Sequence, residues 1–171
     1  MIGATYSGKI TNARHFSFVG EGVIQAKAIK VENIWTRYGT GTAVSVPVTI
    51  TSVSNSYFVA VVAIDGSITQ GSPSLGGVGT TVLVGSGATV GLYINGLINP
   101  TVGSQNFTST LGASDSWRVV CYQLSGVNQG TSTINTNIAL ATSGTSASIN
   151  VTTVQNGLLI DAISIANGAG G

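Results

Sequence analysis

The single histidine and the single cysteine are the residues on which nucleophilic or acid–base catalysis would have to depend. His15 lies in Ala13-Arg14-His15-Phe16, beside a cation and without a neighbouring carboxylate, which is a poor setting for a general base. Cys121 lies at the centre of the most apolar stretch, where burial raises the pKa of a thiol and makes it unreactive. One Cys and one His also exclude a disulfide framework and a Cys/His zinc site. We therefore expect both residues to be structural.

The carboxylates are too scattered to indicate acid–base or metal chemistry. Asp65, Asp115 and Asp161 share no Asp-x-Asp spacing, although they could still converge in space. Asp65 before Gly66 and Asp115 between two serines are typical of turn residues that hydrogen-bond their own backbone. Asp161 interrupts an apolar stretch, so we expect it on a solvent-facing or interfacial side. The alternative is that it is a buried partner of Arg118 or of another cation. We predict no catalytic residue, no cofactor and no metal ligand.

The residues with the most favourable pattern for binding a partner lie in the first forty positions. Trp, Arg and Tyr are enriched at interface hot spots and can stack on sugars, although Trp35 could instead cap one end of the core. Residues 1–40 hold five of the six Lys and Arg and two of the five Asp and Glu, which gives them net charge +3 against −2 for the rest. Such a basic segment can lie across an acidic neighbouring subunit. The predicted partner-contact residues are Lys9, Arg14, Lys27, Lys30, Trp35, Arg37 and Tyr38.

The composition favours a folded β-protein to carry these residues. Charged residues make up 6% of the 171 residues, against about 25% in average domains. Hydrophobic residues make up 43%, and the net charge is +1, which argues against disorder and against a strongly basic nucleic-acid binder. Short apolar runs and few aromatics argue against a membrane span of either kind. The chain begins with Met1 and shows no secretory signal, so we expect it to stay in the cytoplasm or to leave by lysis.

Alternation of apolar and polar residues predicts the strands. Val44–Ile50 alternates and contains Pro47, which cannot donate to a ladder, so this strand is expected at a sheet edge. Tyr57–Ile64 and Trp117–Leu124 are apolar on both faces and are expected in the middle of a sheet, with Gln105–Leu111 as a further separate strand. About eight to ten short strands without a helical pattern predict an all-β fold, a two-sheet antiparallel sandwich of jelly-roll type.

We expect the sandwich domain to occupy residues 41–171, with residues 1–40 as a basic N-terminal arm or extra strands. A series of short motifs follows in order over residues 56–168: Ser74-Leu75-Gly76-Gly77, Val82-Leu83-Val84-Gly85-Ser86, Val90-Gly91-Leu92-Tyr93-Ile94, Asn99-Pro100-Thr101-Val102-Gly103, Ser125-Gly126-Val127-Asn128-Gln129 and a final hairpin around Asn156-Gly157. The order of these motifs resembles the small all-β domains of tailed-phage virion proteins and of some bacterial surface proteins. Leu75 stands where that family usually has Tyr, and Gly130 where Thr often follows Gln.

The resemblance implies a structural or adhesive virion module and brings no catalytic residues. The first hypothesis is a head decoration or cement protein that binds the major capsid protein as a symmetric homo-oligomer, with a trimer favoured. It would be made in the host cytoplasm and lie on the head surface rather than the tail, without binding nucleic acid or membrane. The alternative is a tail-tip or fibre module that binds a host surface glycan. A glycan-degrading enzyme would need an acidic pair in a groove, which the scattered carboxylates do not indicate.

Overall fold

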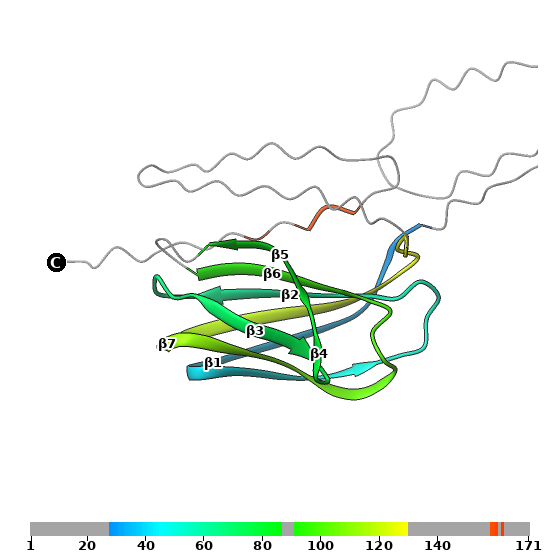
Figure 1. Ribbon diagram of the computed structural model, residues 1–171. Helices are drawn as coiled ribbons and strands as arrows, with labels where there is room; N and C mark the ends of the chain where they lie inside the picture. Colours follow the sequence, from blue (N-terminus) through cyan, green and yellow to red (C-terminus); the bar gives the residue numbers. More distant parts are fainter. Residues whose placement is uncertain (1–27, 87–90, 130–157, 161, 163–171) are drawn as a thin grey trace, which may run out of the picture.

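The computed structural model describes residues 28–86, 91–129, 158–160 and 162. In this part of the chain seven antiparallel strands form one sheet (Figure 1), so the prediction of an all-β antiparallel fold is confirmed. Among these residues no helix is long and apolar enough to cross a membrane. The strands are β1 (Lys30–Ile50), β2 (Tyr57–Ile64), β3 (Gln70–Leu75), β4 (Val78–Gly79), β5 (Thr81–Ser86), β6 (Gly91–Ile98) and β7 (Gly103–Ser125).

The sheet nearly closes on itself. Its strand order is β4-β3-β7-β2-β6-β5, and β1 pairs with β7 off this path. Strands β4 and β5, at the two ends of the order, are joined by Thr80 alone, whose N–H donates to the carbonyl of Pro73 at 2.9 Å. The chain therefore passes directly from one end of the sheet to the other, which gives a barrel-like shape.

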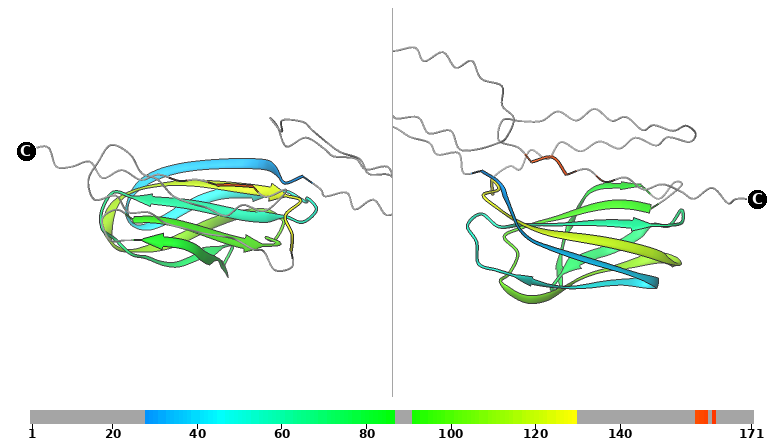
Figure 2. Two further views of the ribbon diagram at one scale, coloured as in Figure 1. Left: turned by 90° about the horizontal axis from the view of Figure 1, so that it is seen from above. Right: turned by 180° about the vertical axis from the view of Figure 1, so that it is seen from behind.

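The prediction of a two-sheet sandwich is wrong, because two long strands run through both halves of the structure. Strand β7 has 23 residues: its first part, to Leu111, pairs with β3, and its second part, from Trp117, pairs with β2. Strand β1 accompanies β7 along both parts (Figure 2). The register shift between Gly41 and Ala43 bends the pair without breaking its hydrogen bonding. The two strands expected over Gln105–Leu111 and Trp117–Leu124 are thus one bent strand, and all strands of the described residues belong to one sheet.

Strand β2 is buried on both faces, as its sequence predicts for a central strand. On the inner face, Phe58 packs near Phe107 with ring centroids 5.9 Å apart, in a cluster that also contains Cys121. On the outer face, Tyr57, Val59, Val61 and Leu124 form a second buried cluster, against which Ile29, Tyr122, Ile160 and Ala162 pack. The sheet around β2 therefore has an apolar core on each side.

Strand β1 is an edge strand, as Pro47 predicts, since among the described strands it pairs with β7 only. It starts at Lys30 and runs to Ile50 without a break. The domain boundary predicted at residue 40 therefore falls inside a strand, and residues 30–40 belong to the sheet. Residues 1–27 of the predicted arm lie outside the described residues.

Candidate functional site

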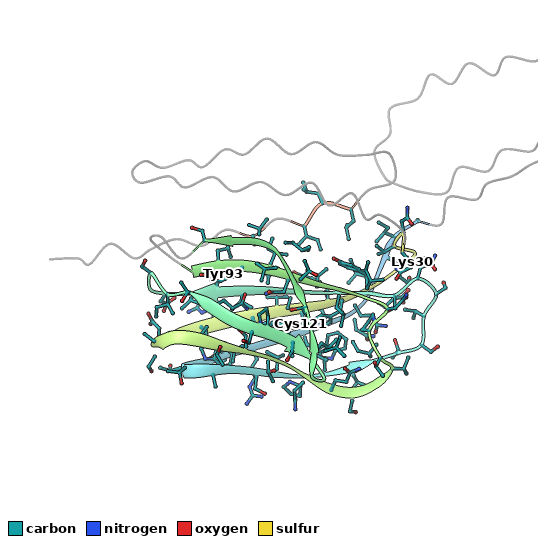
Figure 3. All side chains as sticks on the ribbon, viewed as in Figure 1. Lys30, Tyr93 and Cys121 are labelled. Atoms are coloured by element: carbon teal, nitrogen blue, oxygen red, sulfur yellow. The ribbon has the colours of Figure 1, made fainter. Side chains whose placement is uncertain are left out.

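Four of the predicted contact residues lie on the first half of edge strand β1. Tyr38 is 82% exposed, and Lys30 and Arg37 are exposed as well. Lys30 lies at one end of the sheet (Figure 3). The residues on β1 are Lys30, Trp35, Arg37 and Tyr38; Lys9, Arg14 and Lys27, together with His15, lie outside the described residues.

Trp35 and Arg37 share the inner face of β1. They stand opposite Cys121 and Val119 of β7, and both of those side chains are buried in the inner cluster. Residues directly opposite each other in an antiparallel pair lie on the same face of the sheet. Trp35 accordingly packs against the inner core and is only partly exposed, so the structure supports its role as a core cap. Arg37, near the bend, stays exposed.

The outer face of β1 carries the exposed apolar side chains. Ile34 is 57% exposed and stands opposite Tyr122, while Tyr38 stands opposite the exposed Arg118. Thr36 lies between Ile34 and Tyr38 and is exposed too. We call Ile34, Thr36 and Tyr38 the β1 strip; Arg118 flanks it on the neighbouring strand and adds a cation.

Ile34 and Arg118 are not among the contact residues predicted from the sequence. In the sequence alone, Ile34 is one apolar residue among others, and Arg118 belongs to the apolar run that begins at Trp117. Only the register of β1 on β7 reveals that both face outward near Tyr38. The alternation of Ile34, Thr36 and Tyr38 with Trp35 is the local signal that could have separated the two faces.

A buried side-chain amide holds this half of β1 in place. Gln123 of β7 is fully buried, and its Nε2 donates to the carbonyl of Thr51 at 2.7 Å and to Ser56 Oγ at 3.2 Å. Its Oε1 accepts from the Thr51 N–H at 3.1 Å, the Thr51 hydroxyl at 3.0 Å and Asn33 Nδ2 at 3.0 Å. Asn33 directly precedes Ile34, so this network fixes the start of the β1 strip against β7 and against the loop that follows β1.

Asp65 and Asp115, far apart in the sequence, lie at the same end of the sheet. The Asp65 N–H donates to the carbonyl of Ser116 at 3.1 Å, and the Asp115 carboxylate accepts from the Ser116 N–H at 2.7 Å. The Asp115 side chain also occupies the space where a Cβ on Gly66 would lie. Asp115 does bond to local backbone as predicted, but from within β7 and not from a turn. In the described ranges no group of three His, Cys, Asp or Glu could hold a metal ion, and Asp161 lies outside them.

Cys121 lies in the interior (Figure 3), as the sequence predicts. Burial raises the pKa of its thiol to about 12. The thiol is therefore neutral at physiological pH and is a packing group of the inner cluster.

No family model, curated protein or solved structure matches this chain. The resemblance to phage virion domains stays an expectation, and a function is argued from the β1 strip with Arg118 on the outer face of the sheet.

Proposed function

We propose that this protein is a virion structural protein, a head decoration or cement subunit that binds the outer surface of a capsid and stabilises the shell. The observation that carries the proposal is the β1 strip, whose exposed apolar and aromatic side chains lie beside Arg118 on the outer face of the sheet edge. Tyr and Arg are the residue types that dominate binding energy at protein interfaces. The chemistry of the described residues fits a partner surface that is apolar at its centre and acidic around it.

The size of the contact can be worked from the exposure of Tyr38. A Tyr side chain buries roughly 150–250 Å² at an interface, and 82% of Tyr38 is available. At about 25 cal/mol per Å², burial of that surface contributes up to about 3–5 kcal/mol to binding. Loss of that contribution raises Kd by roughly 150- to 5,000-fold, because every 1.4 kcal/mol is tenfold.

The test is co-sedimentation of recombinant protein with capsid shells stripped of it. Ile34→Ser and Tyr38→Ala should each weaken attachment, whereas Val102→Ser should not. Val102 is the matched control for Ile34, since their side chains are 58% and 57% exposed and Val102 lies before β7, away from the strip. Equal attachment of the strip variants and the Val102 variant would show that the strip is not the contact.

The glycan-binding alternative depends on exposed aromatic side chains beside amide or acidic groups. Both tryptophans are unsuited to this role, because Trp117 is only 5% exposed and Trp35 packs against the core. Among the described residues, Tyr38 is the aromatic residue that supports this second function, because its ring is exposed and can stack on a sugar. Binding of a glycan array that Tyr38→Ala abolishes would favour the tail-module hypothesis.

A further inference from the structure

The first half of β1 offers an open sheet edge. Among the described strands β1 has a partner on one side only, so its other side presents a row of backbone N–H and C=O groups. Pro47 interrupts the donors in the second half of the strand, whereas residues 32–40 contain no proline. The edge that can accept another strand is therefore the half that carries the β1 strip.

The regular part of this edge has defined ends. Register shifts lie between Val31 and Asn33 and between Gly41 and Ala43, and Gly41 has a φ of 133°. Bulges of this kind twist an edge away from a regular ladder. Between them lies a segment about 30 Å long at 3.3 Å per residue, with Thr36 at its middle.

We propose that residues 32–40 of β1 pair antiparallel with the same residues of a second copy of this chain, across a two-fold axis at Thr36. In this register Ile34 of each copy stands opposite Tyr38 of the other copy on the outer face. The two-fold axis therefore creates two such apolar pairs. On the inner face Trp35 stands opposite Arg37, an arrangement in which a guanidinium can lie over an indole ring. Directly opposite residues have Cβ atoms about 4.5–5.5 Å apart, close enough for these pairs to interact.

Neighbouring registers are less favourable. An axis at Arg37 sets two guanidinium groups opposite each other, and like charges directly opposite destabilise a sheet. An axis at Trp35 sets Ile34 opposite Thr36 and leaves Tyr38 opposite Glu32. The sequence of the edge is therefore self-complementary about Thr36, which is the reason for choosing a second copy as the occupant.

This pairing has a consequence for the assembly. An antiparallel contact across a two-fold axis is isologous and yields dimers or even-numbered assemblies, in contrast to the trimer expected from the sequence. It joins the sheets of two copies into one and places the two outer apolar faces side by side. It follows from the fold alone and holds whether or not the protein binds a capsid.

A disulfide reporter tests the register. Cys121 is buried, so a cysteine introduced at Thr36 is the reactive one among the described residues. On the axis, Thr36→Cys stands opposite the same residue of the other copy. The Cα atoms of such a pair are about 4.5–5.5 Å apart, a separation within the range that a disulfide bridges. Thr40→Cys is the matched control: it is exposed on the same face of β1, but its two copies lie about 26 Å apart in the proposed register.

Under mild oxidation, Thr36→Cys should form a covalent dimer at least about tenfold faster than Thr40→Cys, because pairing raises the effective thiol concentration. Equal rates, or a faster Thr40 variant, would overturn the proposal. Light scattering gives a second readout, the mass of the protein in solution. We expect a dimer for the unmodified protein and a monomer for the folded double variant Ile34→Lys, Tyr38→Lys. A trimer, or a monomer at about 100 µM, would contradict the pairing without bearing on capsid attachment.

Discussion

Gln123 is the residue whose replacement tests most sharply how the edge strand is held. Its amide makes five hydrogen bonds, to Asn33, Thr51 and Ser56, and connects β7 with the start of β1 and with the loop after it. Gln123→Met keeps nearly the same volume and removes every one of these bonds. The variant therefore separates hydrogen bonding from packing at a fully buried position.

The expected cost follows from the groups that lose a partner. Ser56 is 7% exposed, so its hydroxyl is left buried after the substitution, whereas Thr51 is exposed and its groups can partly reach water. A buried polar group without a partner costs about 1–3 kcal/mol. The Ser56 hydroxyl is one such group, and the hydrogen bonds of Thr51 are replaced only in part by water. Gln123→Met should therefore lower the free energy of unfolding by about 2–4 kcal/mol. Asn33→Ala, which removes one partly buried bond, should cost about 1 kcal/mol or less.

Urea unfolding followed by tryptophan fluorescence measures both variants, with an unchanged m-value as the condition for comparing them. Amide hydrogen exchange should report the loss first at residues 33–38 of β1, because the network anchors that half of the strand. A Gln123→Met variant within about 0.5 kcal/mol of the natural protein would refute the view that this amide fixes the edge. A large loss without faster exchange in β1 would show that the amide stabilises another part of the sheet.

Two further predictions concern packing and pH. Gly39→Ala should destabilise the fold by about 1–3 kcal/mol, because the new Cβ would lie 2.5 Å from the Trp117 ring, whereas Gly79→Ala has nothing within 4 Å and should be neutral in the same urea assay. Burial raises the pKa of Cys121 from 9.0 to about 12, so the folded thiol keeps its proton at pH values at which the unfolded one has lost it. The contribution of this thiol to the free energy of unfolding is therefore complete below pH 9. It falls as pH rises toward 12, by up to about 1.4 kcal/mol per pH unit. Cys121→Ala should show a shallower decline over that range, and identical slopes would contradict the burial of a neutral thiol.

Local pattern was sufficient to predict several elements of the fold. The two-sided apolar run of β2 indicated a central strand, Pro47 indicated an edge, and the surroundings of Cys121 indicated a core position. The continuity of β7 could not be predicted in this way, because Gly112 and Asp115 resemble turn residues and only the long partner β1 keeps the bend within one ladder. The closure of the sheet through Thr80 depends equally on which distant strands pair.

For the candidate surface too, the local sequence predicted some features, and others depend on which distant strands pair. The sequence placed Trp35, Arg37 and Tyr38 in one short segment, and the structure places them on one strand. Their assignment to two faces, with Trp35 inward and Tyr38 outward, depends on the register with β7, as does the position of Arg118. Non-local pairing therefore decides which of these residues can meet a partner.

Quantitative mass spectrometry of heads and tails separated from purified particles decides whether this protein decorates a capsid. We expect the protein on heads, at a copy number comparable with that of the major capsid protein. A few copies confined to tails, or absence from the particles, would contradict it.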